Sequence, residues 1–152
     1  MVDAMPTRTD ASTADDPGPG VSGPVPGWWR WLIVGAYLVA IFVASSQSRL
    51  PELPGHPSDK VQHSTAYGML GALIVWALVR GDSRRITLRT VVIATVCGVL
   101  YGWSDEFHQI FIPERNYELH DLLADGMGTF VVSTVLWAWG IIARGGMRTH
   151  DV

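Results

Sequence analysis

Apolar runs close to membrane-spanning length constrain this chain more than any other feature. A helix needs about 20 residues to cross a hydrocarbon core of about 30 Å, and four segments of the sequence approach that length. These segments are Trp28 to Ser46, Val61 to Val79, Ile86 to Ile110 and Leu122 to Ala143. Only helices satisfy their own backbone hydrogen bonds in lipid at this spacing. The sequence therefore predicts an all-α fold, an integral membrane bundle of four transmembrane helices.

A soluble four-helix bundle is the rival interpretation, and it requires a polar face on every helix. The stretches 32–44 and 131–143 have almost no polar residues, which favours the membrane. Residues 1–27 are rich in Pro, Gly, Ser, Thr and Asp without apolar periodicity, so we expect a disordered tail there. The expected organisation is a cytoplasmic tail at 1–27, a transmembrane domain at 28–144 and a second cytoplasmic tail at 145–152.

Basic residues set the expected orientation, because cytoplasmic loops of membrane proteins carry an excess of Lys and Arg. The loop after the second run and the segment after the fourth are rich in arginine, whereas the other two loops balance their cations with carboxylates. The arginines are Arg80, Arg84, Arg85, Arg89, Arg144 and Arg148. We therefore expect a multi-pass protein of the cell membrane with both termini cytoplasmic. A signal peptide cleaved at Ala44-Ser45-Ser46 is the alternative for the first run.

Three polar clusters lie at the ends of runs that this orientation places outside the cell. They comprise residues 58–63, 104–109 and 115–125. Ionisable groups at membrane depth cost several kcal/mol unless they are paired or hydrated, and they therefore mark candidate functional sites. Residues four apart share one face of a helix. The spacing predicts that the three clusters meet in one crevice at the outer leaflet.

The candidate site draws on residues from all three clusters. The candidate catalytic residues are Asp105, Glu106, His108 and His63. The candidate ligand-binding residues are Asp59, Lys60, Gln109, Arg115 and Asp121. Burial and neighbouring carboxylates raise the pKa of an acid, and histidine titrates near neutral pH, so this set suits general acid–base catalysis.

Three other interpretations of these residues stay open. Carboxylates and His at helical spacing can bind a metal, but the repeated Glu-x-x-His and the His-Glu-x-x-His patterns are absent from the sequence, so we expect no metal and no cofactor. The cations Lys60 and Arg115 and the histidines could instead recognise an anionic, lipid-linked ligand. A structural role is the third interpretation, because Asp59 and Asp121 are well placed to cap helices.

Glycine pairs recur within three of the runs. They are Gly68 with Gly71, Gly98 with Gly102, and Gly126 with Gly128. Small residues let membrane helices approach closely. The pairs therefore predict helix–helix contacts and not a phosphate-binding loop.

Four motifs occur in a fixed order along the chain. They are Asp59-Lys60-x-x-His63-x-x-x-Tyr67-x-x-Leu70-Gly71, Tyr101-Gly102-x-x-Asp105-Glu106-x-His108-Gln109, Pro113-x-Arg115 and Asp121-Leu122-Leu123-Ala124-Asp125-x-x-Gly128. Together they resemble the VanZ-like family of small membrane proteins, over roughly Ala36 to Gly140. One position departs from the family pattern, because Asp125 stands where the family has Asn. This departure adds a negative charge to the third cluster.

The resemblance implies a protein of the cell envelope that modulates susceptibility to glycopeptide antibiotics, teicoplanin in particular. The expected partner is a membrane lipid or a lipid-linked amphiphile that is bound or acted on at the outer-leaflet site. The alternative is a membrane hydrolase or transferase that acts on a lipid-linked envelope precursor by carboxylate and histidine acid–base chemistry. The net charge of −3 indicates no nucleic-acid partner, and a homo-oligomer stays open. Proton-coupled transport is disfavoured, because polar groups at one end of the helices give no path across.

Overall fold

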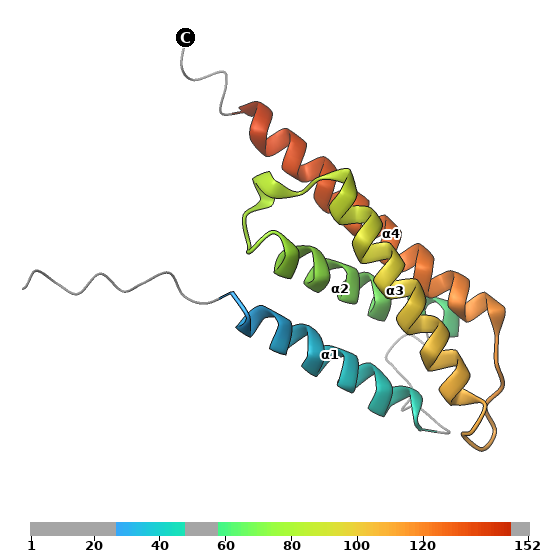
Figure 1. Ribbon diagram of the computed structural model, residues 1–152. Coiled ribbons are helices and arrows are strands. Elements are labelled where there is room, and N and C mark those ends of the chain that lie inside the picture. Colours follow the sequence, from blue (N-terminus) through green and yellow to red (C-terminus); the bar gives the residue numbers. More distant parts are fainter. Residues whose placement is uncertain (1–26, 48–57, 147–152) are drawn as a thin grey trace, which may run out of the picture.

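Four helices and one 3₁₀ turn make up the part of the chain that the structure, a computed structural model, describes. The described residues are 27–47 and 58–146 (Figure 1). The elements are α1 (Trp29–Ser45), α2 (Asp59–Leu78), η1 (Ser83–Arg85), α3 (Leu88–Gln109) and α4 (Leu119–Gly146). The tails expected at 1–27 and 145–152 lie almost entirely outside these residues, and the connection between α1 and α2 lies largely outside them too.

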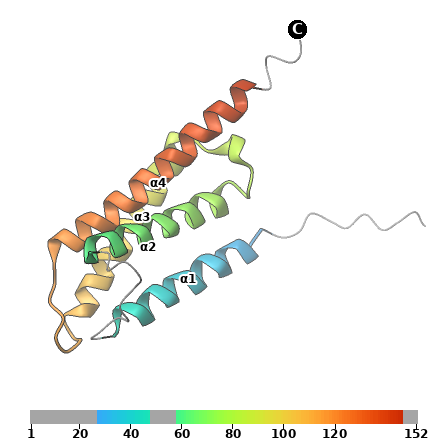
Figure 2. The same cartoon turned by 180° about the vertical axis from the view of Figure 1, so that it is seen from behind.

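The helix α4 is the centre of the packing. It lies along both α2 and α3, whereas α1 packs mainly on α2 and has few contacts with α3 (Figures 1 and 2). Two tyrosines attach α1 through hydrogen bonds: Tyr37 donates its hydroxyl to the carbonyl of Ala66 at 3.0 Å, and Tyr101 donates to the carbonyl of Leu38 at 2.5 Å. The helix α1 is therefore the most loosely packed of the four.

The connection between α2 and α3 follows from local sequence. Arg80 and Gly81 adopt positive φ angles of 55° and 80°, so α2 cannot continue past them. Thr87 caps α3, because its side chain accepts a hydrogen bond from the backbone N–H of Thr90 while the Thr90 side chain accepts from the N–H of Thr87. Arg144 of α4 donates to the carbonyl of Arg84 at 2.8 Å and so holds this turn against the end of α4.

Glycines allow the central helices to approach closely. A methyl group on Gly128 of α4 would overlap the backbone carbonyl of Ser64 on α2. Gly98 and Gly102 of α3 leave room for Thr129 and Asp125 of α4 in the same way, with Asp125 Oδ2 at 2.7 Å from a Cβ built on Gly102. The glycine pairs at 98/102 and 126/128 thus include the residues at which α4 meets its two neighbours.

The expectation of four transmembrane helices is wrong. Among the described helices, one is long and apolar enough to cross a membrane, over Leu119–Gly145 of α4. The helix α1 has only 17 residues. Polar clusters lie inside the other two helices, because α2 begins at Asp59, two residues before the predicted run, and α3 runs through Asp105 and Glu106 to Gln109. These residues lower the mean hydropathy of both helices, and a multi-pass arrangement is not supported.

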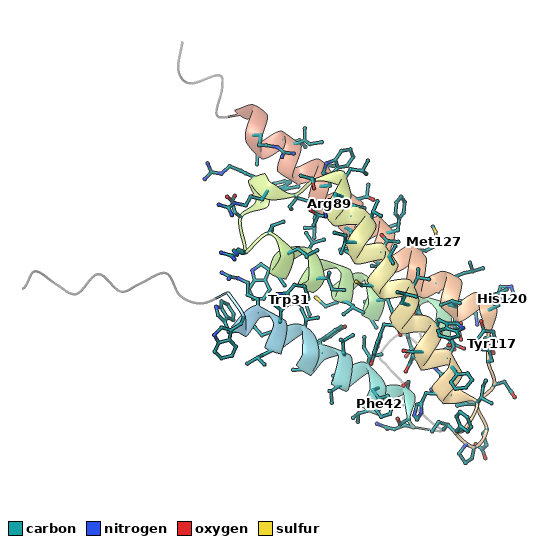
Figure 3. All side chains as sticks on the ribbon, viewed as in Figure 1. Trp31, Phe42, Arg89, Tyr117, His120 and Met127 are labelled. Atoms are coloured by element: carbon teal, nitrogen blue, oxygen red, sulfur yellow. The ribbon has the colours of Figure 1, made fainter. Side chains whose placement is uncertain are left out.

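Large apolar side chains nevertheless cover the outside of the structure. Trp31, Phe42 and Met127 are 48%, 46% and 58% exposed (Figure 3). Similar side chains are exposed on all four helices, for example Met69, Trp103 and Trp139. A surface of this composition suits an apolar environment better than water.

Candidate functional site

The structure brings the three polar clusters together at one end of the helices. This end is formed by the first turns of α2 and α4, the last turns of α3 and the last turn of α1 (Figure 1). Hydrogen bonds and ion pairs link α2 to α4, α1 to α3, and α3 to the segment that leads into α4. Every helix therefore contributes to the site.

His63 of α2 lies between two carboxylates of α4. Its Nδ1 is 2.9 Å from Asp125 Oδ1, and its Nε2 is 3.8 Å from Asp121 Oδ2. Burial lowers the pKa of His63, but the hydrogen bond to Asp125 and the charges of Asp125, Asp121 and Asp59 outweigh it, so the pKa lies above its ordinary value. In the neutral tautomer whose Nδ1–H donates to Asp125, Nε2 is an acceptor.

Lys60 completes the contact between α2 and α4. Its ammonium is 2.7 Å from Glu118 Oε2 and 2.8 Å from Asp121 Oδ1. These carboxylates raise the pKa of Lys60 through their hydrogen bonds. Lys60 is thus engaged in an ion-pair network, and its predicted role in binding a ligand has no support from this geometry.

Asp105 and Glu106 are both buried, with exposures of 4% and 0%, although they are neighbours on α3. They face different elements. Asp105 Oδ1 accepts a hydrogen bond from the hydroxyl of Ser45 on α1 at 2.5 Å, and Glu106 Oε2 accepts from the backbone N–H of Glu118 at 2.9 Å. The amide of Gln109 donates to both carboxylates, at 3.3 and 3.4 Å. The end of α3 thereby joins α1 to the start of α4.

Glu106 should make stability depend on pH. Burial raises the pKa of its carboxyl above the ordinary value of 4.5, and the N–H of Glu118 opposes this only in part. A raised pKa means that the contribution to stability is full below the unfolded pKa and is lost as the pH rises through the folded pKa. Glu106→Gln does not titrate, so its melting temperature relative to wild type should increase from about pH 4 to about pH 8.

The measurement is thermal unfolding of the purified protein across this pH range. The wild-type protein, measured at the same pH values, is the reference. A constant difference between Glu106→Gln and wild type across the range would contradict the prediction.

A groove of about 770 Å³ opens between α1 and α2 next to these residues. Its wall is mainly apolar and comes from both helices: Tyr37, Ala40, Ile41, Ala44, Val61, Ala66, Tyr67 and Met69. Its polar end contains Ser45, Asp59, His63, Asp105, Gln109 and Arg115. Of the predicted site residues, five line this groove directly.

The other four predicted site residues do not line the groove, namely Lys60, Glu106, His108 and Asp121. His108 packs its ring on Phe42, with centroids 4.4 Å apart, and its Nε2 is 3.1 Å from the hydroxyl of Ser46. Glu106 is buried behind the groove wall and does not line it. Arg115 does line the groove, and its guanidinium also donates to the carbonyl of Gln47 at 3.4 Å. Arg115 therefore joins α1 to the polar end.

Sequence reasoning left three contributors out of the candidate site. Asp125 orients His63, and its spacing of four from Asp121 was a usable signal. Tyr67 lines the groove, and its buried hydroxyl has no hydrogen-bond partner among the described residues. Ser45 bonds Asp105, and nothing in the sequence marks it beyond its place at the end of an apolar run. Asp59 and Asp121 do not occupy the N-cap positions expected for them. Asp59 is the first residue of α2, and Asp121 lies inside the first turn of α4.

Comparison with known proteins leaves the family open. No family model matches the chain, and no solved structure matches it. An uncharacterized protein of Schizosaccharomyces pombe is 29% identical over 99 residues, which are 65% of this chain and 59% of that protein. The chain therefore spans less than two thirds of that relative's length. The resemblance to the VanZ-like family stays a prediction that rests on the four motifs.

Proposed function

We propose that this chain is a VanZ-like membrane protein that binds an amphiphile of the cell envelope in the groove between α1 and α2. Through this binding it modulates susceptibility to a lipid-tailed glycopeptide such as teicoplanin. The groove carries the proposal, because one continuous cavity has an apolar wall and a polar end. The resemblance of the motifs supplies the class of ligand.

The groove matches an amphiphile in size and in chemistry. Its volume of about 770 Å³ is within the usual range for small-molecule sites. Ala40, Ala44 and Ala66 keep the wall open for an acyl chain. At the polar end, Asp105 and Asp59 can accept hydrogen bonds from hydroxyl or amino groups, and Arg115 can donate to an anionic group.

A membrane location is supported by two observations. The segment Leu119–Gly145 is long and apolar enough to cross a bilayer. Exposed apolar side chains on the other helices can contact lipid around it.

The orientation in the membrane follows from the arginines. Arg84, Arg85 and Arg144 lie at the end of α4 opposite the groove's polar end. By the excess of positive charge in cytoplasmic regions, we place that end in the cytoplasm and the polar site at the outer leaflet.

Filling the groove should abolish binding. Ala40→Phe puts a ring into the cavity, so the affinity of the purified protein in nanodiscs for teicoplanin should fall at least about tenfold, which corresponds to about 1.4 kcal/mol. Ala138→Phe is the matched control, because Ala138 is an exposed alanine of α4 outside the groove. A glycopeptide without an acyl chain should bind the wild type more weakly. Equal affinity of Ala40→Phe and Ala138→Phe for teicoplanin would contradict the proposal.

The same pair of variants tests the cellular role. A strain that lacks the protein is complemented with wild type, Ala40→Phe or Ala138→Phe at matched membrane levels. Wild type and Ala138→Phe should restore the original teicoplanin susceptibility, and Ala40→Phe should not. If the deletion leaves susceptibility unchanged, the implied phenotype does not apply to this chain.

One observation favours the enzymatic alternative. His63 is oriented by Asp125 and lines the groove, which is the arrangement of a general base held by a carboxylate. Such a pair suits a hydrolase or transferase that acts on a lipid-linked envelope precursor. Mass spectrometry of such a precursor after incubation with the protein separates the two functions. A changed mass that is lost in His63→Gln supports the enzyme, and an unchanged mass contradicts it.

A further inference from the structure

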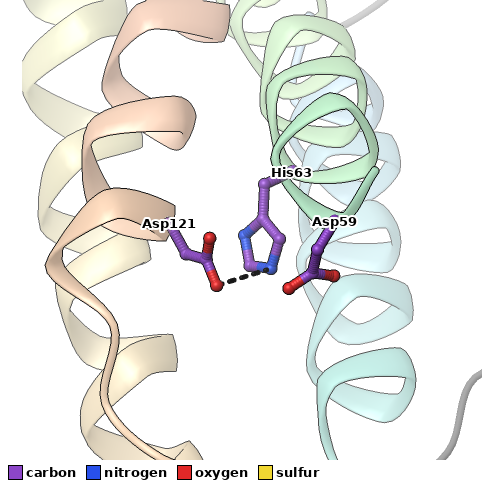
Figure 4. A group of neighbouring side chains, drawn as sticks. All are labelled: Asp59, His63 and Asp121. Atoms are coloured by element: carbon purple, nitrogen blue, oxygen red, sulfur yellow. Dashed lines mark ion pairs between the residues drawn. The ribbon is translucent and has the colours of Figure 1, made fainter. Parts of the chain in front are cut away.

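Three potential metal ligands converge at the rim of the groove. Asp59 and His63 are four apart on α2 and share one face, and Asp121 approaches them from α4 (Figure 4). One donor atom from each residue lies within 4.8 Å of the other two. The set contains one imidazole nitrogen and two carboxylate oxygens, which are ligands for first-row divalent metals.

Asp121 provides a second observation that points to a bound cation. Its side chain is only 5% exposed, and Lys60 pairs with Oδ1 at 2.8 Å. Within the described part of the chain, Oδ2 has one polar neighbour in ion-pair range, Nε2 of His63 at 3.8 Å. That separation is too long for a hydrogen bond. The carboxylate of Asp121 is thus a buried anion: its Oδ2 faces a ring nitrogen beyond hydrogen-bond distance, and its Oδ1 has an ion pair but no hydrogen-bond partner among the described residues.

A metal ion between Nε2 of His63 and Oδ2 of Asp121 fits their separation better than a shared proton does. A proton on Nε2 would still leave the N···O separation at 3.8 Å. Zn²⁺ forms bonds of about 2.0–2.2 Å to both imidazole nitrogen and carboxylate oxygen, so one ion between the two atoms spans the gap with little movement. Two carboxylates would also balance the charge of a divalent cation.

Asp125 holds His63 in the orientation that a metal requires. The hydrogen bond from Nδ1 to Asp125 Oδ1, at 2.9 Å, directs Nε2 toward Asp59 and Asp121. Histidines that bind metals usually donate their other ring nitrogen to a carboxylate in this way. Asp125 is 1% exposed, so its position is fixed by packing.

We propose that Asp59, His63 and Asp121 form a binding site for one divalent metal ion of the Zn²⁺ class. Three protein ligands leave at least one coordination position open, as in catalytic and not structural zinc sites. Asp59 and His63 line the groove, so the open position faces its polar end. The inference goes beyond the proposed function and does not rest on it, and it replaces the expectation of no metal drawn from the sequence.

The test is calorimetric titration of the full, tag-free chain in nanodiscs with Zn²⁺ alone, after treatment with a chelator. Wild type should bind one ion. Asp59→Asn, His63→Gln and Asp121→Asn should each weaken binding at least about tenfold. His120→Gln is the matched control, since His120 is exposed and adjacent to Asp121 (Figure 3). Its affinity should equal that of wild type.

Lys60→Gln distinguishes loss of metal ligands from loss of the folded structure. Because the ammonium pairs with Asp121 and repels a cation, its removal should strengthen Zn²⁺ binding several-fold. A misfolded variant cannot produce a gain in affinity at the same stoichiometry. The proposal is overturned if wild type binds no Zn²⁺, if the three ligand variants bind as wild type does, or if Lys60→Gln binds more weakly. Because Zn²⁺ binding is measured without any amphiphile, failure of the metal proposal can be distinguished from failure of the amphiphile proposal.

Discussion

Gly128→Val is expected to prevent stable folding, or to lower stability by more than about 3 kcal/mol. A Cβ at this position would overlap the carbonyl and Cα atoms of Ser64, which are backbone atoms of α2. Backbone cannot rotate out of the way as a flexible side chain can, so α4 must move away from α2 as a whole. Gly128→Ala should show the same effect with a smaller magnitude.

Gly35→Ala is the matched control for this prediction. A Cβ built on Gly35 of α1 meets no atom within 4 Å. Alanine is also the better helix former, so this variant should be as stable as wild type or more stable by about 0.5–1 kcal/mol. Thermal unfolding of both purified variants decides the matter. If Gly128→Ala and Gly35→Ala melt together, close approach at Gly128 does not limit the packing of α2 and α4.

Asp125→Ala is expected to cost about 3 kcal/mol, the second largest effect. The change removes the hydrogen bond to Nδ1 of His63 and leaves that donor buried without a partner. It also opens a cavity beside Gly102, where Asp125 fills the space that a side chain would take. Both consequences act on the contact between α2 and α4.

Asp125→Asn separates shape from charge at the same position. The amide keeps the size of the carboxylate, and its oxygen can still accept from Nδ1 of His63. It is also the residue that the VanZ-like pattern has here. We therefore expect a loss of less than about 1 kcal/mol, measured by denaturant or thermal unfolding. A loss as large as that of Asp125→Ala would mean that the negative charge itself stabilises the fold.

The helices and their packing glycines could be predicted from the sequence, but their relation to a membrane could not. Apolar runs marked the approximate course of all four helices. The second run was predicted to begin at Val61, whereas Asp59 and Lys60 already form the first turn of α2. The third run was predicted to include Glu106, which does lie in the last turn of α3, but the effect of such residues on the hydropathy of the helix was not taken into account. A helix can continue through polar residues when their side chains bond to neighbouring helices. Hydropathy is calculated from one segment at a time and therefore does not include those bonds.

The candidate site was predictable where its contacts are local and not where they come from another helix. Spacing of four along α2 correctly grouped Asp59 with His63. The pairing of Lys60 with Glu118, and of Asp105 with Ser45, joins residues that are 58 and 60 positions apart. One sequence carries no information on such pairs. His108 was predicted to be a catalytic residue together with Asp105, yet its ring contacts Phe42 of α1 and Ser46, the residue that follows α1.

The loose attachment of α1 gives the two walls of the groove different mechanical properties. The wall formed by α2 is fixed, because α2 is locked to α4 by glycine contacts and by the ion pairs of Lys60 and His63. The wall formed by α1 depends on a few side-chain hydrogen bonds, chiefly those of Tyr37 and Tyr101. Under the proposed function, a bulky tail would displace α1 before it disturbed α2. Tolerance for the tail would then be independent of selectivity for the head group, and one site would accept amphiphiles that share a head but differ in chain length.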